Sequence, residues 1–289
     1  MQTNRQVFVF GATGQQGSSL IEALLPDGHH ITGLSRNPDS PKAQALRSQG
    51  IQMKKGDFTD EAALTELMQG MDTVFFMTTP FEKGTEHETQ QGITVANAAK
   101  QAGVGHLIYS SVGGANLGTG IPHFDSKYLV EQHIQSLGIP YTIIAPVYFM
   151  ENAISPWSLE ALKEGVIRQA MPGDRLLQQV SVKDIGKMAA IAVNRRESMF
   201  GKRIDLAGDN VTGEQAAHIL SQASGKSIRY EGFPADILKT QNEDLGLMYE
   251  WFDKVGYSSD IDGLHAEYPE LQLENLQNWA AKQDWTVLN

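Results

Sequence analysis

Short apolar runs alternate with amphipathic stretches along the first half of the chain. The apolar runs are QVFVF, HITGLS, IQMKKG, DTVFFM, HLIYSSV and YTIIAPV. Helical patterns begin near Gln15, Pro41 and Asp60, a long one ends at about Gln101, and another surrounds Lys127. Strands that are apolar on both faces and separated by helices belong to a parallel sheet that is covered on each side. The pattern predicts an α/β fold with a doubly wound parallel sheet of the Rossmann type.

The alternation weakens after Pro146. In SVKDIGKMAAIAVN, Ser181 and Asp184 have the spacing of a helix-start capping box, and KRIDLAG predicts one more strand. The segments PWSLEALKEG and TGEQAAHILSQASG and the tail from about Phe233 are richer in helical patterns and aromatic residues. We therefore predict a main domain and a smaller, mostly helical C-terminal lobe. The main domain takes residues 1–150 and 180–208, and the lobe takes residues 151–179 and 209–289.

The chain has 289 residues, a formal net charge of −11 and no cysteine. Affinity for phosphate backbones depends on Lys and Arg, so this charge argues against direct nucleic-acid binding. Without cysteine there is no disulfide, thiol nucleophile or cysteine-based zinc site, and the histidines lack metal-ligand spacing, so we expect no metal site. The apolar run VFVF stops at Gly11, too early for a signal peptide or a membrane span. We expect a cytoplasmic protein.

Three glycines follow the first predicted strand at three-residue spacing. In VFVFGATGQQGSSLIEALL, Gly11, Gly14 and Gly17 lead from the strand into a helix. Small residues at these places allow a tight turn, a close approach of a pyrophosphate to the backbone, and access to the amides at the helix N-terminus. An ordinary strand-to-helix turn is the alternative, but the strand before the loop and the helix after it favour dinucleotide binding.

The second predicted strand ends at Ser35 and Arg36. This point lies about 20 residues beyond the loop, where NAD-binding proteins usually carry an acid for the ribose 2′-hydroxyl. An arginine instead makes paired hydrogen bonds to a 2′-phosphate, and Ser35 adds another donor. We therefore predict that NADP(H) is preferred over NAD(H). The alternative is a solvated Arg36 that caps the strand.

Three further strand ends face the same crevice, because ligands of such sheets bind at the carboxyl ends of the strands. Asp57 and Phe58 follow the third strand and are placed to flank an adenine. The later strand ends carry Thr78, Thr79 and Pro80 after the fourth strand and Ser111 after the fifth. Ordinary turn chemistry is the alternative for each of these ends when it is taken alone.

Taken together, these motifs resemble those of the NmrA-like family, an atypical branch of the short-chain dehydrogenase/reductase superfamily. The matching stretches are GATGQQG, SRNP, KKGDFTD, HFDSKYLVEQHIQSLGIPYTIIAPVYFMEN and SVKDIGKMAA, which together span most of the chain. The resemblance implies an NAD(P)-binding Rossmann domain with a small C-terminal lobe and a preference for NADP. It also implies one of two activities. These are regulation of a protein partner in response to the NADP(H) state, and NADPH-dependent reduction as in quinone reductases.

The resemblance assigns roles to individual residues. Arg36 would bind the 2′-phosphate, Asp57 and Phe58 would border the adenine, and Lys127 would reach the ribose or the nicotinamide. The phosphate loop would consist of Gly11, Thr13, Gly14, Gln15, Gln16 and Gly17, and the nicotinamide end would be walled by Tyr148, Phe149 and Asn152.

One position departs from the wider superfamily. Its enzymes carry a proton-donating Tyr four residues before the Lys, whereas here His123 stands four residues before Lys127. An imidazole transfers protons near neutral pH, and residues four apart on a helix share a face. His123 and Lys127 are therefore candidate catalytic residues. The alternatives are a first-turn histidine that packs or caps, and a surface lysine paired with Glu131.

Two functions of different class follow from these features. The first is an NADPH-dependent reductase that transfers hydride to a small carbonyl, quinone or related substrate, with Tyr109, Tyr128 or Tyr148 as substitute proton donors. The second is a non-catalytic redox sensor that responds to NADPH and NADP⁺ and regulates a protein partner. A sugar-nucleotide epimerase is a weaker alternative, because that chemistry usually relies on the missing Tyr. The substrate and the oligomeric state, a homodimer included, stay open.

Overall fold

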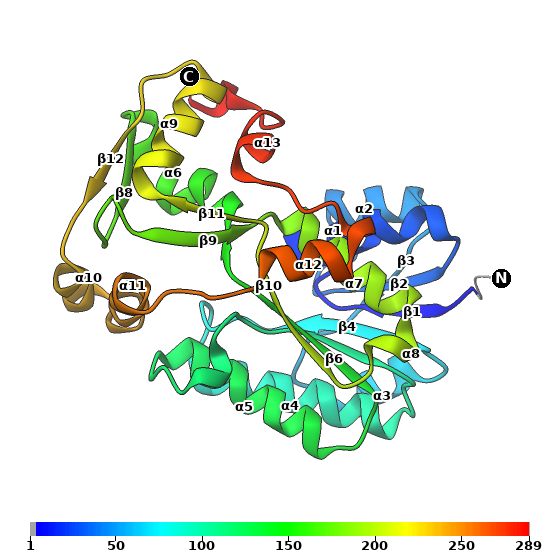
Figure 1. Ribbon diagram of the computed structural model, residues 1–289. Coiled ribbons are helices and arrows are strands. Elements are labelled where there is room, and N and C mark those ends of the chain that lie inside the picture. The colour runs from blue at the N-terminus through cyan, green and yellow to red at the C-terminus, as the bar shows by residue number, and fades with distance from the viewer. Residues whose placement is uncertain (1–3, 289) are drawn as a thin grey trace. The chain divides into compact units, whose positions relative to one another are not determined.

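The apolar runs of the first half come together in one sheet. The computed structural model describes residues 4–288, and its largest sheet has seven strands in the order β10-β6-β5-β4-β1-β2-β3 (Figure 1). The strands are β1 (Gln6–Val9), β2 (His30–Ser35), β3 (Gln52–Lys55), β4 (Thr73–Met77), β5 (Leu107–Ser110), β6 (Tyr141–Pro146) and β10 (Lys202–Leu206). From β3 to β6, each strand runs parallel to its neighbour. The predicted parallel α/β sheet is confirmed.

Helices cover both faces of this sheet, as a doubly wound fold requires (Figure 1). One face carries α1 (Gln15–Leu24), α2 (Pro41–Ser48) and α7 (Val182–Asn194), and the other carries α3 (Glu61–Met68), α4 (Thr85–Gln101) and α5 (Pro122–Ser136). A short helix, α8 (Arg196–Met199), precedes β10. Side-chain caps fix several of the helix starts. Ser40 and Asp60 accept hydrogen bonds from backbone amides three residues later, and Ser181 accepts one from Asp184 at 3.1 Å.

Aromatic side chains fill the space between the sheet and the α3, α4 and α5 layer. Phe8, Phe10, Phe76 and Tyr109 are fully buried there, and the rings of Phe76 and Tyr109 lie 4.7 Å apart between centroids. Residues of a close-packed core tolerate little displacement. The core therefore holds the carboxyl ends of β1, β4 and β5 in fixed relative positions.

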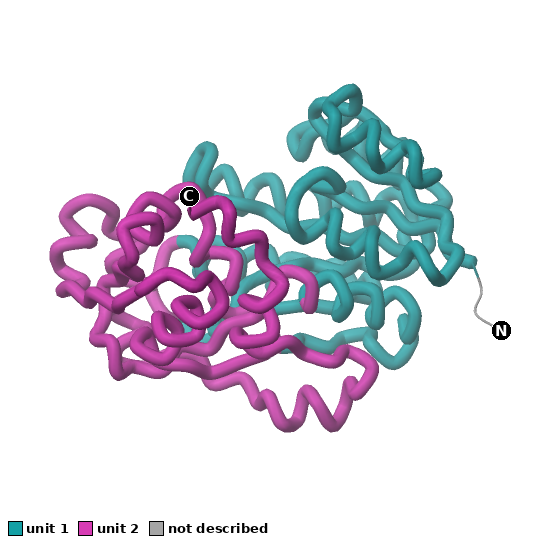
Figure 2. The backbone as a smooth tube through the Cα atoms, turned by 90° about the horizontal axis from the view of Figure 1, so that it is seen from above, with its two compact units in different colours: residues 1–118, 123–145, 185–204 teal, residues 119–122, 146–184, 205–289 magenta. Residues whose placement is uncertain are grey.

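The chain divides into two compact units (Figure 2). Unit 1 takes the chain up to residue 118 together with 123–145 and 185–204, and unit 2 takes 119–122, 146–184 and the chain from residue 205. The assignment of a cofactor domain and a substrate or partner lobe stays a prediction. None of the helices within residues 4–288 is long and apolar enough to cross a lipid bilayer.

Unit 2 contains more strand than the sequence predicts. One sheet has the order β11 (Asp209–Thr212), β9 (Leu176–Val180), β7 (Tyr148–Phe149), and a second pairs β12 (Arg229–Gly232) with β8 (Val166–Gln169). The helices are α6 (Pro156–Lys163), α9 (Gly213–Ser224), α10 (Ala235–Gln241), α11 (Glu243–Lys254), α12 (Ile261–Glu267) and α13 (Leu276–Ala280). β9 does not stand out as a strand because it places polar Gln178 and Gln179 in buried positions.

Gly186 allows α7 to lie directly against α1 within unit 1. A methyl group at this position would come within 2.4 Å of the carbonyl carbon of Ser19 and 2.6 Å of its oxygen. Helix propensity alone predicts that Gly186→Ala stabilises the fold by about 1 kcal/mol. Overpacking against backbone predicts a loss of about 1–3 kcal/mol instead. We expect the loss, measured as a lower midpoint of urea unfolding, and a midpoint at or above that of the parent would contradict the close packing.

Candidate functional site

The carboxyl ends of five neighbouring strands bring most of the predicted site residues to one edge of the sheet in unit 1. Because β1 to β5 run parallel, their carboxyl ends lie at this same edge, which we call the cofactor edge. It carries Gly11 to Gly17 after β1, Ser35 and Arg36 at the end of β2, Asp57 and Phe58 after β3, Thr78, Thr79 and Pro80 after β4, and Ser111 after β5.

The turn between β1 and α1 has the geometry that a dinucleotide needs. Gly11 has a φ of +60°, and the amide of Gly14 donates to its carbonyl oxygen at 2.8 Å. A methyl group on Gly17 would lie 2.3 Å from that oxygen, so a larger residue would push the helix away. No side chain caps α1 at Gly14, and the first turn of α1 carries no acidic residue. The N-terminal amides of α1 are therefore open to an anion.

The remaining residues of this turn also fit a nucleotide cofactor. Thr13 is partly exposed and Gln15 is exposed. Gln16 is buried, and its Oε1 atom has no hydrogen-bond partner among residues 4–288. A buried acceptor without a donor is costly, and a hydroxyl of a bound nucleotide would satisfy it. The β1–α1 turn thus offers donors for a pyrophosphate and one acceptor for a hydroxyl.

Arg36 makes a paired ion contact at the end of β2. Its Nη1 and Nη2 atoms each donate to one oxygen of Glu82 at 2.8 Å, and both side chains are largely exposed. The hydrogen bonds and the opposite charge raise the pKa of Arg36 and lower the pKa of Glu82, so both groups are charged at neutral pH. The hydroxyl of Ser35 accepts from the amide of Asn37 at 3.2 Å. Sequence analysis did not identify Glu82.

Asp57 and Phe58 follow β3 and are held by different contacts. The hydroxyl and the amide of Thr59 donate to Asp57 Oδ1 at 2.6 and 2.8 Å, and these bonds lower the pKa of the Asp57 carboxyl. Phe58 leans on the core, with its ring centroid 5.2 Å from that of Phe10. Asp57 is exposed at the cofactor edge, while Phe58 is half buried. Both positions suit the border of a flat ligand.

Lys127 is buried in α5, so the interpretation as a solvated helix-surface lysine is wrong. Only 9% of Lys127 is exposed, and its Nζ atom donates to the Thr78 carbonyl at 2.8 Å and to Glu88 Oε1 at 2.6 Å. Glu88, on α4, has no exposure and also accepts from the hydroxyls of Ser126 at 2.5 Å and Thr78 at 3.2 Å. An ammonium has three donors, and these contacts use two of them. Lys127 is therefore fixed in place, and among residues 4–288 one N–H of its ammonium has no acceptor.

The hydroxyls of Thr78 and Ser111 belong to two buried networks at the cofactor edge. The Thr78 hydroxyl also lies 3.1 Å from the hydroxyl of Tyr109, and burial raises the pKa of this Tyr well above its usual value. Ser111 donates to Glu131 of α5, which is fully buried and pairs with Arg203 of β10 at 2.9 Å. Glu131 thus has a cation partner on the sheet, whereas the sequence alternative paired it with Lys127.

His123 lies one helical turn before Lys127 in α5. It is 9% exposed, and its ring packs edge to face against Phe124 at 4.8 Å between centroids. The packing of His123 agrees with the alternative of a first-turn histidine that packs or caps, and its catalytic role stays a prediction.

Thr79 and Pro80 follow Thr78 in the turn after β4 and are partly exposed.

The three residues predicted beside the nicotinamide belong to unit 2. Tyr148 and Phe149 form β7, and Asn152 lies in the 3₁₀ turn that follows. The hydroxyl of Tyr148 accepts a hydrogen bond from Gln169 at 3.3 Å. Burial raises the pKa of Tyr148, and hydrogen bonds with Tyr249, Gln169 and Asn152 oppose that rise.

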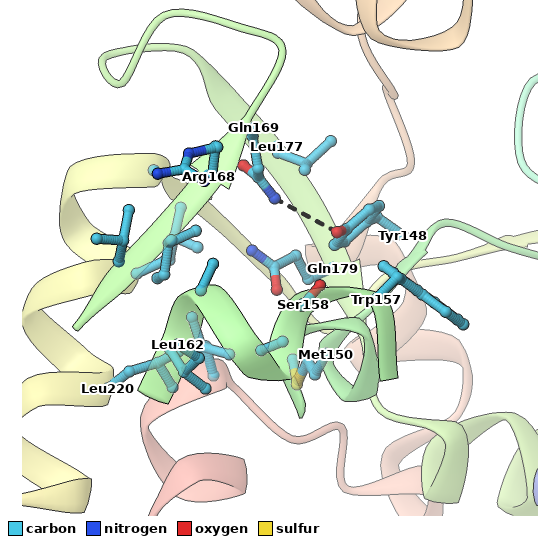
Figure 3. A pocket seen from close by; sticks show the side chains of 18 of the residues that line it. Tyr148, Met150, Trp157, Ser158, Leu162, Arg168, Gln169, Leu177, Gln179 and Leu220 are labelled. Carbon is cyan, nitrogen blue, oxygen red and sulfur yellow. Dashed lines mark hydrogen bonds between the residues drawn. The ribbon is translucent and has the colours of Figure 1, made fainter. Parts of the chain in front are cut away.

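Tyr148 lines a pocket of about 250 Å³ within unit 2 (Figure 3). The walls are mostly apolar and come from α6, β8, β9 and α9, with Leu162 and Leu220 at one end of the view. Polar groups of Tyr148, Gln169 and Gln179 point into the same space. An apolar pocket with a few convergent polar groups is typical of a small-molecule site, and this volume is slightly below the usual range of about 300–1,000 Å³.

The contact partners of the predicted residues carry little signal in the sequence. Glu82, before α4, and Glu88, in the first turns of α4, both belong to the acidic stretch FEKGTEHET, which has no periodicity that separates a buried carboxylate from an exposed one. Arg203 stands in the predicted strand KRIDLAG without any local signal for its pairing. The partners are far apart in sequence, and only the fold brings them together.

The chain is similar in sequence and in structure to known proteins. Quinone oxidoreductase 2 of Escherichia coli is 34% identical over 247 residues, which cover 83% of this chain and 82% of that protein. A solved structure of an NADPH-dependent quinone oxidoreductase from Escherichia coli, complexed with NADPH, has a TM-score of 0.80 and 30% identity and covers 95% of this chain and 98% of that one.

A second solved structure, that of a negative transcriptional regulator called Nmra, has a TM-score of 0.81 and 20% identity and covers 98% of this chain and 100% of that one. At this identity it shows the fold alone. The family model described as the NmrA-like family matches residues 3–280. The chain therefore belongs to the NmrA-like family, as its glycine loop, its SRNP segment and its HFDSK helix predict.

Proposed function

We propose that this chain binds NADP(H) and reduces a small carbonyl, quinone or related substrate by hydride transfer. One observation carries the proposal: the buried ammonium of Lys127 is held by Glu88 and Thr78 at the same edge as the uncapped N-terminus of α1. An anion site and a fixed cation on one sheet edge suit the phosphates and the ribose of a nicotinamide cofactor. NADPH in the Escherichia coli relative supports this assignment.

Several groups at the cofactor edge then hold parts of the cofactor. The amides at the start of α1 bind the pyrophosphate, and the guanidinium of Arg36 binds the 2′-phosphate as a fork. Asp57 and Phe58 border the adenine. The third N–H of Lys127 donates to a ribose hydroxyl. We assign Tyr148, Phe149 and Asn152 to the nicotinamide end on the family resemblance.

The bound nicotinamide supplies the hydride, and the chain supplies position and a proton. Lys127 is a fixed positive charge, because Glu88 and Thr78 hold its ammonium in place. Tyr109 has no solvent exposure, and its hydroxyl is bonded to Thr78, so it does not reach a substrate directly. His123, on the same helix as Lys127, is the side chain that we assign to proton transfer, either directly or through a water.

The pocket of unit 2 suggests the size of the substrate. Its volume of about 250 Å³ accommodates a compound of one or two rings, and its apolar walls favour a flat or aliphatic body. Tyr148 and Gln169 provide polar contacts for an oxygen. The name of the quinone oxidoreductase among the relatives agrees with an oxygen-bearing, electron-poor ring.

Arg36→Ala tests the assignment of the 2′-phosphate. We expect the parent to bind NADPH more tightly than NADH, and the variant to lose about tenfold to a hundredfold in NADPH affinity, because charge-assisted hydrogen bonds to the phosphate are removed. NADH affinity should not change. Isothermal titration measures both. Arg47→Ala is the matched control, since Arg47 is an exposed arginine on α2 that pairs with Asp39. Equal affinity of the parent for NADPH and NADH would refute the preference.

A second prediction concerns turnover and Lys127. NADPH oxidation by the parent should be steady with at least one member of a panel of quinones and aldehydes. Lys127→Ala alone would leave Glu88 buried without a cation, at a cost of about 3–5 kcal/mol. We therefore use Lys127→Met with Glu88→Gln, which removes both charges and keeps the volume similar. We expect this variant to stay folded and to lose about a hundredfold in turnover, because a preorganised charge is removed.

The thermal unfolding midpoint of the same double variant shows whether it is folded. A folded variant with unchanged turnover would exclude a role for the Lys127 ammonium in the reaction. A variant that unfolds is replaced by Lys127→Arg, which keeps the positive charge but not the contact geometry, and the same loss of turnover is expected from it.

A non-catalytic redox sensor is a second candidate, and one observation favours it. His123 stands where the superfamily carries its proton-donating Tyr, and its ring packs against Phe124 in a position that is 9% exposed. Without a proton donor that reaches the substrate, the chain would bind NADP(H) and signal through its conformation.

The sensor function makes its own prediction. No member of the substrate panel would be reduced, and NADPH and NADP⁺ would give different molar masses in light scattering or different protection of amide hydrogens. Turnover of any panel member at a rate that the double variant loses would exclude the purely non-catalytic function.

A further inference from the structure

Glu82 occupies the guanidinium that the proposed function assigns to the 2′-phosphate. It lies in the turn between β4 and α4, and both of its oxygens contact Arg36, each at 2.8 Å. Two N–H groups of the guanidinium donate to the two carboxylate oxygens, and arginine binds a phosphate with the same paired hydrogen bonds. A 2′-phosphate that approaches the same two N–H groups therefore meets a site already filled by a carboxylate.

The surroundings make this competition electrostatic as well as geometric. A 2′-phosphate carries up to two negative charges near neutral pH, and an adjacent carboxylate repels it. Asp57, on the neighbouring strand end, adds a further negative charge close enough to act on Arg36. Lys83, next to Glu82, opposes this field at both carboxylates. Bound NADPH must therefore displace Glu82, whereas NADH brings only a neutral 2′-hydroxyl to the same place.

We propose that Glu82 is a specificity-determining residue that acts as an internal anion on Arg36 and lowers the preference for NADPH over NADH. The inference rests on the proposed role of Arg36. The Arg36–Glu82 pair is exposed, with 70% and 51% of the two side chains accessible, so it exchanges partners at little cost. The carboxylate also offers the ribose 2′-hydroxyl of NADH the acceptor that NAD-binding proteins usually provide at the end of the second strand.

The test replaces Glu82 with Gln, which keeps the shape of the side chain and removes its charge. We expect NADPH to bind about two- to fivefold more tightly to Glu82→Gln, the range of an exposed ion pair, and NADH not to bind more tightly. Adenosine 2′,5′-bisphosphate tests the Arg36–Glu82 pair separately, because it carries the 2′-phosphate without the nicotinamide. It should gain affinity by the same factor, while AMP should not. Isothermal titration at low and high salt gives these values, and the gain should shrink as salt screens the pair.

Glu86→Gln is the matched control. Glu86 is an exposed acid in the first turn of α4, four residues beyond Glu82, and its replacement changes the net charge by the same amount. A gain in NADPH affinity that is equal in the two variants would be an effect of net charge and would overturn the inference. Combining Glu82→Gln with Arg36→Ala should abolish the gain, because the contact that the two residues share is then gone.

The outcome for Arg36 separates this inference from the proposed function. If Arg36→Ala in the parent weakens NADPH binding but Glu82→Gln does not strengthen it, the role of Glu82 is wrong and the NADP assignment stands. If Arg36→Ala leaves the affinities for NADPH and adenosine 2′,5′-bisphosphate unchanged, the 2′-phosphate assignment fails and the role of Glu82 fails with it.

Discussion

Two carboxylates without solvent exposure, Glu88 and Glu131, determine how the α4 and α5 side of unit 1 is built. A carboxylate removed from water is strongly unfavourable unless a cation and further donors compensate for its lost hydration. Glu88 receives Lys127 and two hydroxyls, and Glu131 receives Arg203 and the hydroxyl of Ser111. These contacts join α4 and α5 to the ends of β4, β5 and β10. They fix the rotation of α5 about its own axis, and with it the direction of the Lys127 ammonium.

The first half of the fold was predictable because its signals are local. The buried strands are apolar runs, α1 begins at the glycine turn, and α2 and α3 begin at the caps Ser40 and Asp60. The extra strands of unit 2 were not predictable in the same way. β8 and β12 are short strands of mixed apolar and polar residues. They pair with each other across more than sixty positions, as in the register of Arg168 with Glu231, so no local periodicity marks them.

The candidate site divides along the same line. Spacing and strand order place Gly11, Gly17 and Arg36 at the cofactor edge from the sequence alone. The burial of Lys127 depends on Glu88, which is 39 positions away, and spacing alone favoured a surface lysine paired with Glu131. An acidic helix start looks the same in sequence whether its carboxylate faces water or a buried ammonium. The i, i+4 spacing of a helix therefore predicts which helix face carries Lys127, but it does not predict the partner of Lys127.

Three cations of unit 1 and their carboxylate partners bear on the proposed binding of a phosphorylated cofactor by this acidic chain. Arg36, Lys127 and Arg203 each contact a carboxylate, so none of them presents an uncompensated charge. The N-terminus of α1 differs, because neither a capping side chain nor an acidic residue in its first turn neutralises it. In the proposed complex, the pyrophosphate is thus attracted chiefly by backbone amides, whose charge does not titrate. Of the three ion pairs, the Arg36 pair is exposed and can exchange its carboxylate for a phosphate, while the pairs of Lys127 and Arg203 contain fully buried acids and cannot be opened without a large penalty. Under the proposed function, selection between NADPH and NADH therefore belongs to the exposed pair, and the buried pairs fix the geometry around the ribose.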